Sequence, residues 1–274
     1  MRIAHVSDLH FGHHDEGLAA GLAGDLASQS PDLVVASGDF TQRGTAEEFA
    51  TARRFLDTLA APVFAVPGNH DVPGRNMVRR LFNPYGLYRR YIAADTEPFV
   101  EADGVAIAGI RTSRRMRMEL NWSHGSIGRA QLERLEATFA RASPGAVRIV
   151  VAHHPLLRPE TLTAVPTRAV RHSAEALESF ARLGVRLVLS GHFHLSYVRR
   201  YEQGTVRDGV PPGMREAAAG PILVAQASST ISTRLRGEPN AYNLVDIDAG
   251  TITVTVREWR EGRWTTRETA SARA

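Results

Sequence analysis

The chain has 274 residues, a length at which a large α/β fold often forms one domain, and its 33 basic and 29 acidic residues leave a formal charge of only +4. The absence of cysteine excludes a disulfide framework, a thiolate nucleophile and cysteine-ligated zinc. Any metal must therefore have harder ligands. No long run of one charge suggests a nucleic-acid-binding tail, and we expect no nucleic-acid partner.

The N-terminal residues lack the long apolar core of a signal peptide, and no later run approaches the roughly 20 apolar residues that span a bilayer. We therefore expect a cytoplasmic protein with no membrane span. We also predict a single domain over residues 1–266 and a frayed tail over residues 267–274.

Short apolar runs without in/out alternation predict buried strands through the first two thirds of the chain. These runs are 3–6, 33–36, 63–66, 105–110, 149–152 and 187–189. Helical patterns lie between many of these runs, at residues 18–28 and 129–142. A third helix is predicted to begin at a capping box of Thr45 and Glu48 and to run towards Leu59. A fourth is predicted from Ser173 to Leu183, where Gly184 can end it. This alternation predicts a layered α/β sheet.

The C-terminal third changes character and predicts three more strands, at 222–227, 244–247 and 252–256, with a hairpin turn at 248–250. We interpret them as a second sheet packed on the first. Residues 72–100 are rich in proline, arginine and tyrosine and interrupt the strand pattern, which favours a surface insertion or a lid.

Polar motifs follow the apolar runs in order, each just beyond the carboxyl end of a predicted strand. They are Asp8-Leu9-His10, Gly38-Asp39, Gly68-Asn69-His70-Asp71, His153-His154-Pro155 and Gly191-His192-Phe193-His194. Because parallel strands of an α/β sheet end at one rim, these residues are predicted to converge on one crevice.

The motifs carry the ligand types of a dinuclear metal site, in which two divalent ions about 3.5 to 4 Å apart share a bridging carboxylate. Asp39 is the candidate bridge. Asp8, His10 and His194 would complete the protein ligands of one ion, and Asn69, His153 and His192 those of the other. A bridging hydroxide would fill the gap. Mixed carboxylate and imidazole ligands favour Mn, Fe, Zn or Co over Mg or Ca.

The five-part series resembles the signature of the calcineurin-like metallophosphoesterase superfamily, with its DxH, GD, GNHD, H and GHxH elements, over about residues 2 to 195. Within that superfamily the chain is most similar to bacterial class III cyclic-nucleotide phosphodiesterases, given its length, Gly38-Asp39-Phe40-Thr41 and the His-His-Pro. The resemblance implies an α/β, four-layer αββα sandwich of two mixed sheets flanked by helices, with the metals at the edge where strands end.

His70 follows Asn69 directly, so we expect it to face the substrate and to donate a proton or hydrogen bond to the phosphoryl or leaving oxygen. The superfamily likewise uses a histidine here. Asp71 would orient the imidazole of His70. His70 and Asp71 are therefore the candidate catalytic residues.

The predicted reaction is hydrolysis of a small-molecule phosphodiester by metal-bound hydroxide, with a 3′,5′- or 2′,3′-cyclic nucleotide as the best substrate. A nucleoside-diphosphate lipid pyrophosphatase, a glycerophosphodiesterase and a nuclease are alternatives at the same metal pair. A non-catalytic metal-binding scaffold is the alternative of another class. Oligomeric state, including a homodimer, stays open.

Several further residues have two interpretations. We expect His5 to be a hydrogen-bonded core histidine, His154 to lie behind the ligands and His172 to lie on the surface. For a last group, substrate contact and a purely structural role both fit. In the structural role, His13, His14 and Arg115 would be solvated, and Trp122, His124 and Arg234 would pack within loops.

Overall fold

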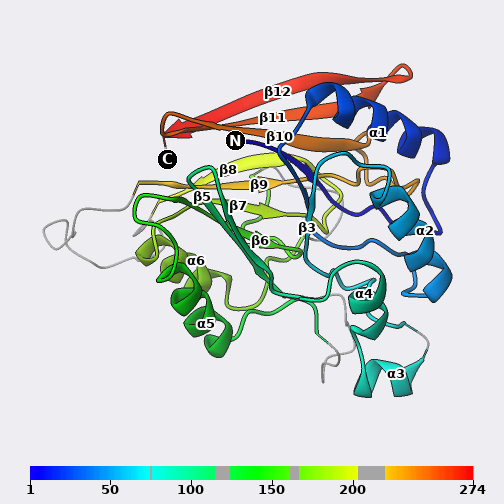
Figure 1. Cartoon of the computed structure of the whole chain (residues 1–274), viewed down its shortest axis with the longest axis horizontal. Helices are drawn as coiled ribbons and strands as arrows, with labels where there is room; N and C mark the ends of the chain where they lie inside the picture. The colour runs from blue at the N-terminus through cyan, green and yellow to red at the C-terminus, as the bar shows by residue number, and fades with distance from the viewer. Residues whose placement is uncertain (75, 115–123, 161–166, 203–219, 274) are drawn as a thin grey trace, which may run out of the picture.

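The computed structural model describes residues 1–74, 76–114, 124–160, 167–202 and 220–273. Two six-stranded sheets lie face to face, and helices cover their outer surfaces (Figure 1). Both sheets are mixed, so the predicted α/β sandwich of two mixed sheets is confirmed.

The first sheet has the order β12-β11-β10-β1-β2-β3 and unites the two ends of the chain. Its strands are β1 (Arg2–Val6), β2 (Leu33–Ala36), β3 (Val63–Ala65), β10 (Ala241–Asp248), β11 (Thr251–Arg260) and β12 (Arg263–Arg273). Strands β1, β2 and β3 are parallel, and β10 pairs antiparallel with β1. The carboxyl ends of β1, β2 and β3 therefore share one edge.

The second sheet has the order β4-β5-β6-β7-β9-β8, with parallel strands in the centre and an antiparallel strand at each edge. Its strands are β4 (Phe99–Ala102), β5 (Val105–Ile110), β6 (Val147–Ala152), β7 (Val185–Ser190), β8 (Tyr197–Tyr201) and β9 (Ile222–Gln226). The central runs are buried on both faces, which explains why they lack in/out alternation.

The principal helices connect the parallel strands, and two of them begin at a residue whose side chain caps the helix, Asp15 and Thr45. These helices are α1 (Glu16–Gln29), α2 (Ala46–Leu56), α5 (Arg129–Phe139) and α6 (Ser173–Arg182). Thr45 and Glu48 form the predicted capping box of α2. His172 occupies the N-cap of α6, so the predicted cap, Ser173, is the first helical residue instead.

Three apolar clusters hold the layers together. One lies between the first sheet and α1 and α2, another between the second sheet and α5 and α6, and the third between the two sheets. The third contains Val35 of the first sheet and Ile107 of the second, both fully buried. These clusters give the four layers that Figure 1 shows edge on.

Two expectations about the C-terminal region are wrong. Its strands do not form a sheet of their own, because β10 to β12 extend the N-terminal sheet and β9 joins the other. The expected frayed tail is instead strand β12, which pairs with β11 as far as Arg273 opposite Thr251. The open edge of β11 offers backbone partners along its length, so a largely polar segment is ordered without an apolar run.

Residues 72–100 combine surface and core, whereas we expected a surface insertion or lid. The segment contains two short helices, α3 (Met77–Phe82) and α4 (Gly86–Tyr91), and leads into β4. Tyr85 and Tyr88 are buried against the first sheet. Helix α3 projects at the corner of the molecule beyond α4 (Figure 1).

None of the helices in the described ranges has the length and apolar character needed to cross a bilayer.

His5 lies in the core, as predicted, and its imidazole is held in one neutral tautomer. Asn243 Nδ2, which can only donate, lies 3.2 Å from His5 Nδ1, and His5 Nε2 donates to Ser37 Oγ at 3.0 Å. Burial lowers the pKa of His5 to about 3, against an opposing effect of Asp8. The fold therefore selects an uncharged ring.

Because His5 is buried as a neutral ring, acid should destabilise the fold through its protonation. The contribution of neutral His5 to the free energy of unfolding is complete above its unfolded-state pKa of 6.5 and is lost as pH falls from there towards about 3. Replacing His5 with glutamine should reduce the loss of unfolding free energy between pH 6.5 and pH 5 by about 2 kcal/mol. Urea unfolding at both pH values measures this difference. His172→Gln, at an exposed position, should keep the wild-type pH dependence, and an equally steep His5→Gln profile would contradict the prediction.

Candidate metal centre

The predicted site residues lie where five parallel strands end. Asp8 follows β1, Asp39 follows β2, Asn69 follows β3, His153 follows β6 and His192 follows β7. The loops after β1 and β2 run side by side, with backbone bonds from Asp8 N to Gly38 O (3.1 Å) and from His10 N to Asp39 O (3.0 Å). The facing sheets thus bring residues far apart in sequence to one edge.

Asp8, His10 and His194 form the first group, and all three side chains are buried. Asp8 Oδ1 lies 3.6 Å from His10 Nε2 and 3.3 Å from His194 Nε2, and these two ring nitrogens are 3.3 Å apart. His194 Nδ1 donates to a backbone carbonyl, so in the neutral ring Nε2 has a lone pair directed at the group. Such a convergence of electron pairs suits a cation.

The second group centres on His153, whose Nε2 lies 3.1 Å from Asn69 Oδ1 and 3.3 Å from Asp39 Oδ2. His192 stands beside it, with ring centroids 5.2 Å apart. Asp39 Oδ2 is also 3.7 Å from His10 Nε2 in the first group. One carboxylate oxygen therefore lies between the two groups, which is the position that a bridging ligand requires.

Much of the site has a left-handed backbone. Among the non-glycine residues with positive φ are five of the seven predicted metal residues, Asp8 (52°), His10 (49°), Asp39 (55°), His192 (78°) and His194 (57°). This region costs free energy for residues with a Cβ and is retained where surrounding contacts enforce it. It turns successive side chains towards one point.

Two glycines permit this close assembly. Gly38 has φ +101°, and a Cβ there would lie 2.6 Å from Gly68 N and 2.9 Å from His153 Nδ1. A Cβ on Gly191 would overlap the Ser7 hydroxyl and meet Asp8 Oδ2 at 2.5 Å. A side chain at either position would push the loops from the two sheets apart.

The site combines buried negative charge with imidazoles. Burial works to raise the pKa of Asp39, but the charges of His153 and His70 outweigh it and hold that pKa well below 3.8. Burial likewise lowers the pKa of His153, yet the Asp39 carboxylate outweighs this and raises it to about 9. The two aspartates therefore attract positive charge into the site.

Asp8 supplies an independent test of whether the residues fit a metal ion. Its Oδ2 accepts hydrogen bonds from Ser7 Oγ (2.6 Å) and His192 N (2.8 Å), whereas the buried Oδ1 has no hydrogen-bond donor. A buried carboxylate oxygen without a donor is costly unless a cation meets it. This oxygen faces His10 and His194, so the donor set fits a divalent ion.

His70 lies at the accessible side of the site. It is half-buried, its ring meets that of His10 edge to face at 4.8 Å, and its backbone N–H donates to Asp39 Oδ1 at 2.8 Å. Its Nδ1 donates to the carbonyl of Gln42 at 2.7 Å, since a carbonyl can only accept. Nε2 is thus the ring nitrogen left for a substrate or a metal.

Asp71 does not orient His70, so that expectation is wrong. Its carboxylate is fully buried and accepts hydrogen bonds from Thr41 N, Thr41 Oγ1 and Gly68 N. Burial and the charge of Asp39 raise the pKa of Asp71 to about 6. Asp71 ties the loop after β2 to the loop after β3, and the Gln42 carbonyl takes the orienting role.

The residues behind the rings include backbone groups that sequence analysis missed. The carbonyl of Ser37 accepts from His153 Nδ1, and the carbonyl of Arg234 accepts from His194 Nδ1, both at 2.8 Å. Such bonds leave Nε2 available to a metal. A carbonyl exists at every position, so no side-chain signal marks these partners.

The structure places most of the residues with two interpretations. His13 is exposed, while His14 is half-buried against Phe11, with ring centroids 4.5 Å apart. His154 is buried behind the ligands beside His192, and its Nδ1 pairs with Thr112 Oγ1 at 2.7 Å.

Arg234 reaches the rim of the site, where its Nη1 donates to Gln42 Oε1 at 3.2 Å. His124 is half-buried in the loop before α5. Arg115 and Trp122 lie outside the described residues.

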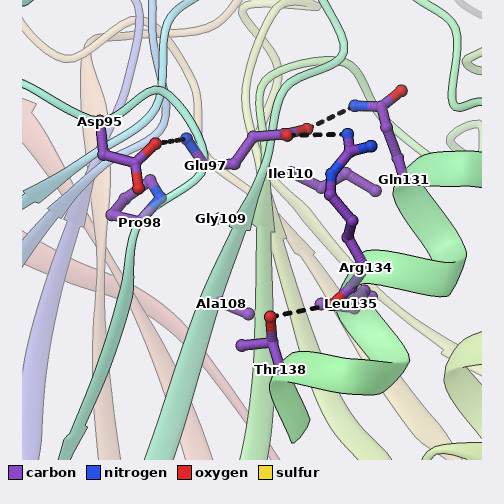
Figure 2. Close-up of a pocket in the computed structure, with 10 residues that line it drawn as sticks. All are labelled: Asp95, Glu97, Pro98, Ala108, Gly109, Ile110, Gln131, Arg134, Leu135 and Thr138. Carbon is purple, nitrogen blue, oxygen red and sulfur yellow. Dashed lines mark hydrogen bonds and ion pairs between the residues drawn. The ribbon is translucent and has the colours of Figure 1, made fainter.

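A cavity of about 240 Å³ lies away from the metal centre, between α5 and β5 (Figure 2). Glu97 spans its mouth, accepting from Gln131 Nε2 (2.5 Å) and pairing with Arg134 Nη2 (3.1 Å). None of the predicted site residues lines it. These polar groups already bind one another and attach α5 to the segment before β4.

A family model and several related sequences indicate the same family for this chain. The model of the family described as calcineurin-like phosphoesterase matches residues 1–196. A probable cyclic nucleotide phosphodiesterase of Synechococcus sp. is 27% identical over 209 residues, covering 73% of this chain and 75% of that protein.

Two further relatives match over shorter shares. The glycerophosphodiester phosphodiesterase GpdQ of Enterobacter lignolyticus is 42% identical over 83 residues, covering 26% of this chain and 30% of that protein. The 3′,5′-cyclic adenosine monophosphate phosphodiesterase CpdA of Haemophilus influenzae is 26% identical over 174 residues, covering 60% of this chain and 54% of that protein.

Solved structures share the fold. A dimetal phosphatase from Danio rerio superposes with a TM-score of 0.66 at 13% identity, covering 97% of this chain and 98% of that one. A purple acid phosphatase from yellow lupin gives the same TM-score and identity, covering 99% of this chain and 53% of that one.

Proposed function

We propose, from the premise that this chain belongs to the calcineurin-like phosphoesterase family, that it acts on a phosphodiester and that a cyclic nucleotide is its best substrate. The family makes it a metal-dependent phosphoester hydrolase. The observation that carries the proposal is the place of Asp39 Oδ2, within 3.3 Å of His153 Nε2 and 3.7 Å of His10 Nε2.

This arrangement supports the proposed ligand assignment. Asp39 would bridge two ions of Mn, Fe, Zn or Co, with Asp8, His10 and His194 on one side and Asn69, His153 and His192 on the other. When bound, two such ions supply a nucleophile at neutral pH and neutralise charge that develops on the phosphoryl group.

The chain's own residues complete the reaction. The Gln42 carbonyl holds His70 through Nδ1, leaving Nε2 to donate a proton to the departing oxygen. A second proton on the ring makes it a cation, which matches the anionic phosphoryl group. The relatives named as cyclic nucleotide phosphodiesterases support the substrate, and the shorter GpdQ match supports a glycerophosphodiester as the second candidate.

The substrate is tested by kcat/KM of the metal-reconstituted protein, since kcat/KM measures transition-state preference and binding alone does not. The panel comprises 3′,5′-cyclic AMP, 2′,3′-cyclic AMP, a glycerophosphodiester, a nucleotide-linked glycolipid, a phosphomonoester and single-stranded DNA. We expect the two cyclic nucleotides to be turned over fastest. Faster turnover of the glycerophosphodiester would select the second candidate, and metal content without hydrolysis of an activated aryl diester would indicate a scaffold.

Metal removal should destabilise the fold, because the ions bind the native ligand set and not the unfolded chain. Saturating metal at about 100 times its Kd contributes about 2.7 kcal/mol per site, so chelation should lower Tm by roughly 5 to 10 °C. Differential scanning calorimetry before and after chelation measures the shift, and adding metal back should restore the original Tm. An unchanged Tm after verified removal would contradict coupling between metal binding and stability.

A further inference from the structure

Helix α3 exposes apolar side chains that no other helix in the described ranges exposes. Six large hydrophobic residues are exposed in the described structure, and four lie in α3: Met77 (40%), Val78 (70%), Leu81 (38%) and Phe82 (84%). Their spacing of one, three and four residues places them on one side of the helix. We call these four residues the α3 face.

The α3 face is presented by an anchored segment. Asn76 caps α3 by accepting from Arg79 N at 2.9 Å, and Arg80 turns inward to donate to Pro73 O at 3.0 Å. Immediately afterwards, Tyr85 donates to the carbonyl of Ser113 at 2.8 Å and is buried. Helix α4 thus packs on the protein, whereas α3 lies at the outer corner of the molecule (Figure 1) and its four apolar side chains are exposed.

Positive charge surrounds this face. From residue 72 to residue 94 the sequence has five arginines and no acidic residue. Arg79, Arg89 and Arg90 are exposed in the described structure. An outward apolar helix face flanked by exposed arginines is the combination that binds an anionic bilayer surface, where the apolar side chains enter the interface and the guanidinium groups meet lipid phosphates.

We infer that the α3 face and its flanking arginines form a peripheral docking surface for a bilayer that contains anionic phospholipid. The charge complementarity selects this occupant over a second copy of the chain, because two copies would bring the same arginines together. The α3 face begins at Met77, seven residues beyond His70, so docking would hold the metal centre near the membrane. The inference concerns binding alone and holds whichever phosphodiester is the substrate.

Co-sedimentation with vesicles tests the surface in the full chain. Vesicles of equal parts phosphatidylcholine and phosphatidylglycerol should bind the protein at least about tenfold more tightly than pure phosphatidylcholine vesicles, and salt should weaken the binding. Val78→Ser with Phe82→Ser should weaken it at least about tenfold, and Arg79→Glu with Arg89→Glu should weaken it similarly. Arg263→Glu, at an exposed position at the start of β12, is the charge control and should have less than half that effect on the logarithm of the affinity.

The surface variants should keep the wild-type Tm and hydrolyse a water-soluble aryl diester at the wild-type rate. Equal binding to the two kinds of vesicle, or unchanged binding by both double variants, would overturn the inference. Sedimentation of the wild type as a dimer that Phe82→Ser dissociates would also overturn it, by assigning the face to a second copy. If the metal-reconstituted wild type failed to hydrolyse the aryl diester, the proposed function would be rejected, whereas the vesicle-binding result would still decide the docking surface.

Discussion

Replacing Asp39 with alanine is expected to reduce kcat by about a thousandfold or more and to lower the metal content below two ions per chain. Its Oδ2 lies between the two groups, near His153 and His10, while Oδ1 accepts the His70 backbone N–H at 2.8 Å. The substitution therefore removes the proposed shared ligand together with an anchor of His70, the proposed proton donor. Elemental analysis and hydrolysis of an aryl phosphodiester measure the two losses.

Two further variants serve as controls for the loss of side-chain volume at position 39 and for the loss of a carboxylate elsewhere. Asp39→Asn retains one oxygen and nearly the same volume, so it should preserve more of the fold than Asp39→Ala while still losing most activity. Asp57→Ala, an exposed carboxylate at the end of α2, should leave metal content and turnover unchanged. Two fully bound ions with near-normal turnover in Asp39→Ala would remove the bridging role.

Replacing His70 with alanine should retain both ions but lower kcat by about a hundredfold or more for a substrate with an alkoxide leaving group. The imidazole is half-buried at the accessible side of the site and held through Nδ1 by the Gln42 carbonyl. An aryl leaving group needs less protonation, so the defect should shrink for an aryl diester. Single-turnover kinetics on the two diesters compare these defects.

Metal content distinguishes this role from ligation, because the His70 ring also lies near His10 and Asp39. Loss of one ion in His70→Ala would make His70 a ligand. Defects of equal size for aryl and alkyl diesters would argue against a proton donor. His172→Ala, at the exposed start of α6, is the matched control and should behave as wild type.

The sequence alone determined the principal local structure and supplied the proposed members of the candidate site. Apolar runs without alternation identified the central strands, because burial on both faces selects apolar residues at every position. The capping box of Thr45 and Glu48 was visible because it depends on residues three apart. The candidate site residues could be proposed from the sequence because each side chain carries its own chemistry and parallel strands end at one edge.

Strand partners were decided by the tertiary structure. An apolar run reports burial and not the neighbouring strand, so pairing of β10 with β1 was not predictable from the C-terminal pattern. Strand β12 is ordered by the open edge of β11, although its own residues alternate only partly. Both outcomes depend on backbone hydrogen bonds between segments distant in sequence.

Only the tertiary structure decided how the site is oriented. The Ser37, Gln42 and Arg234 carbonyls hold the imidazoles, and the left-handed backbone at Asp8 and Asp39 aims the carboxylates. Backbone groups are the same at every position, and their direction depends on packing between the two sheets. The residue types therefore specify which chemistry is available, and the long-range packing decides which atoms meet.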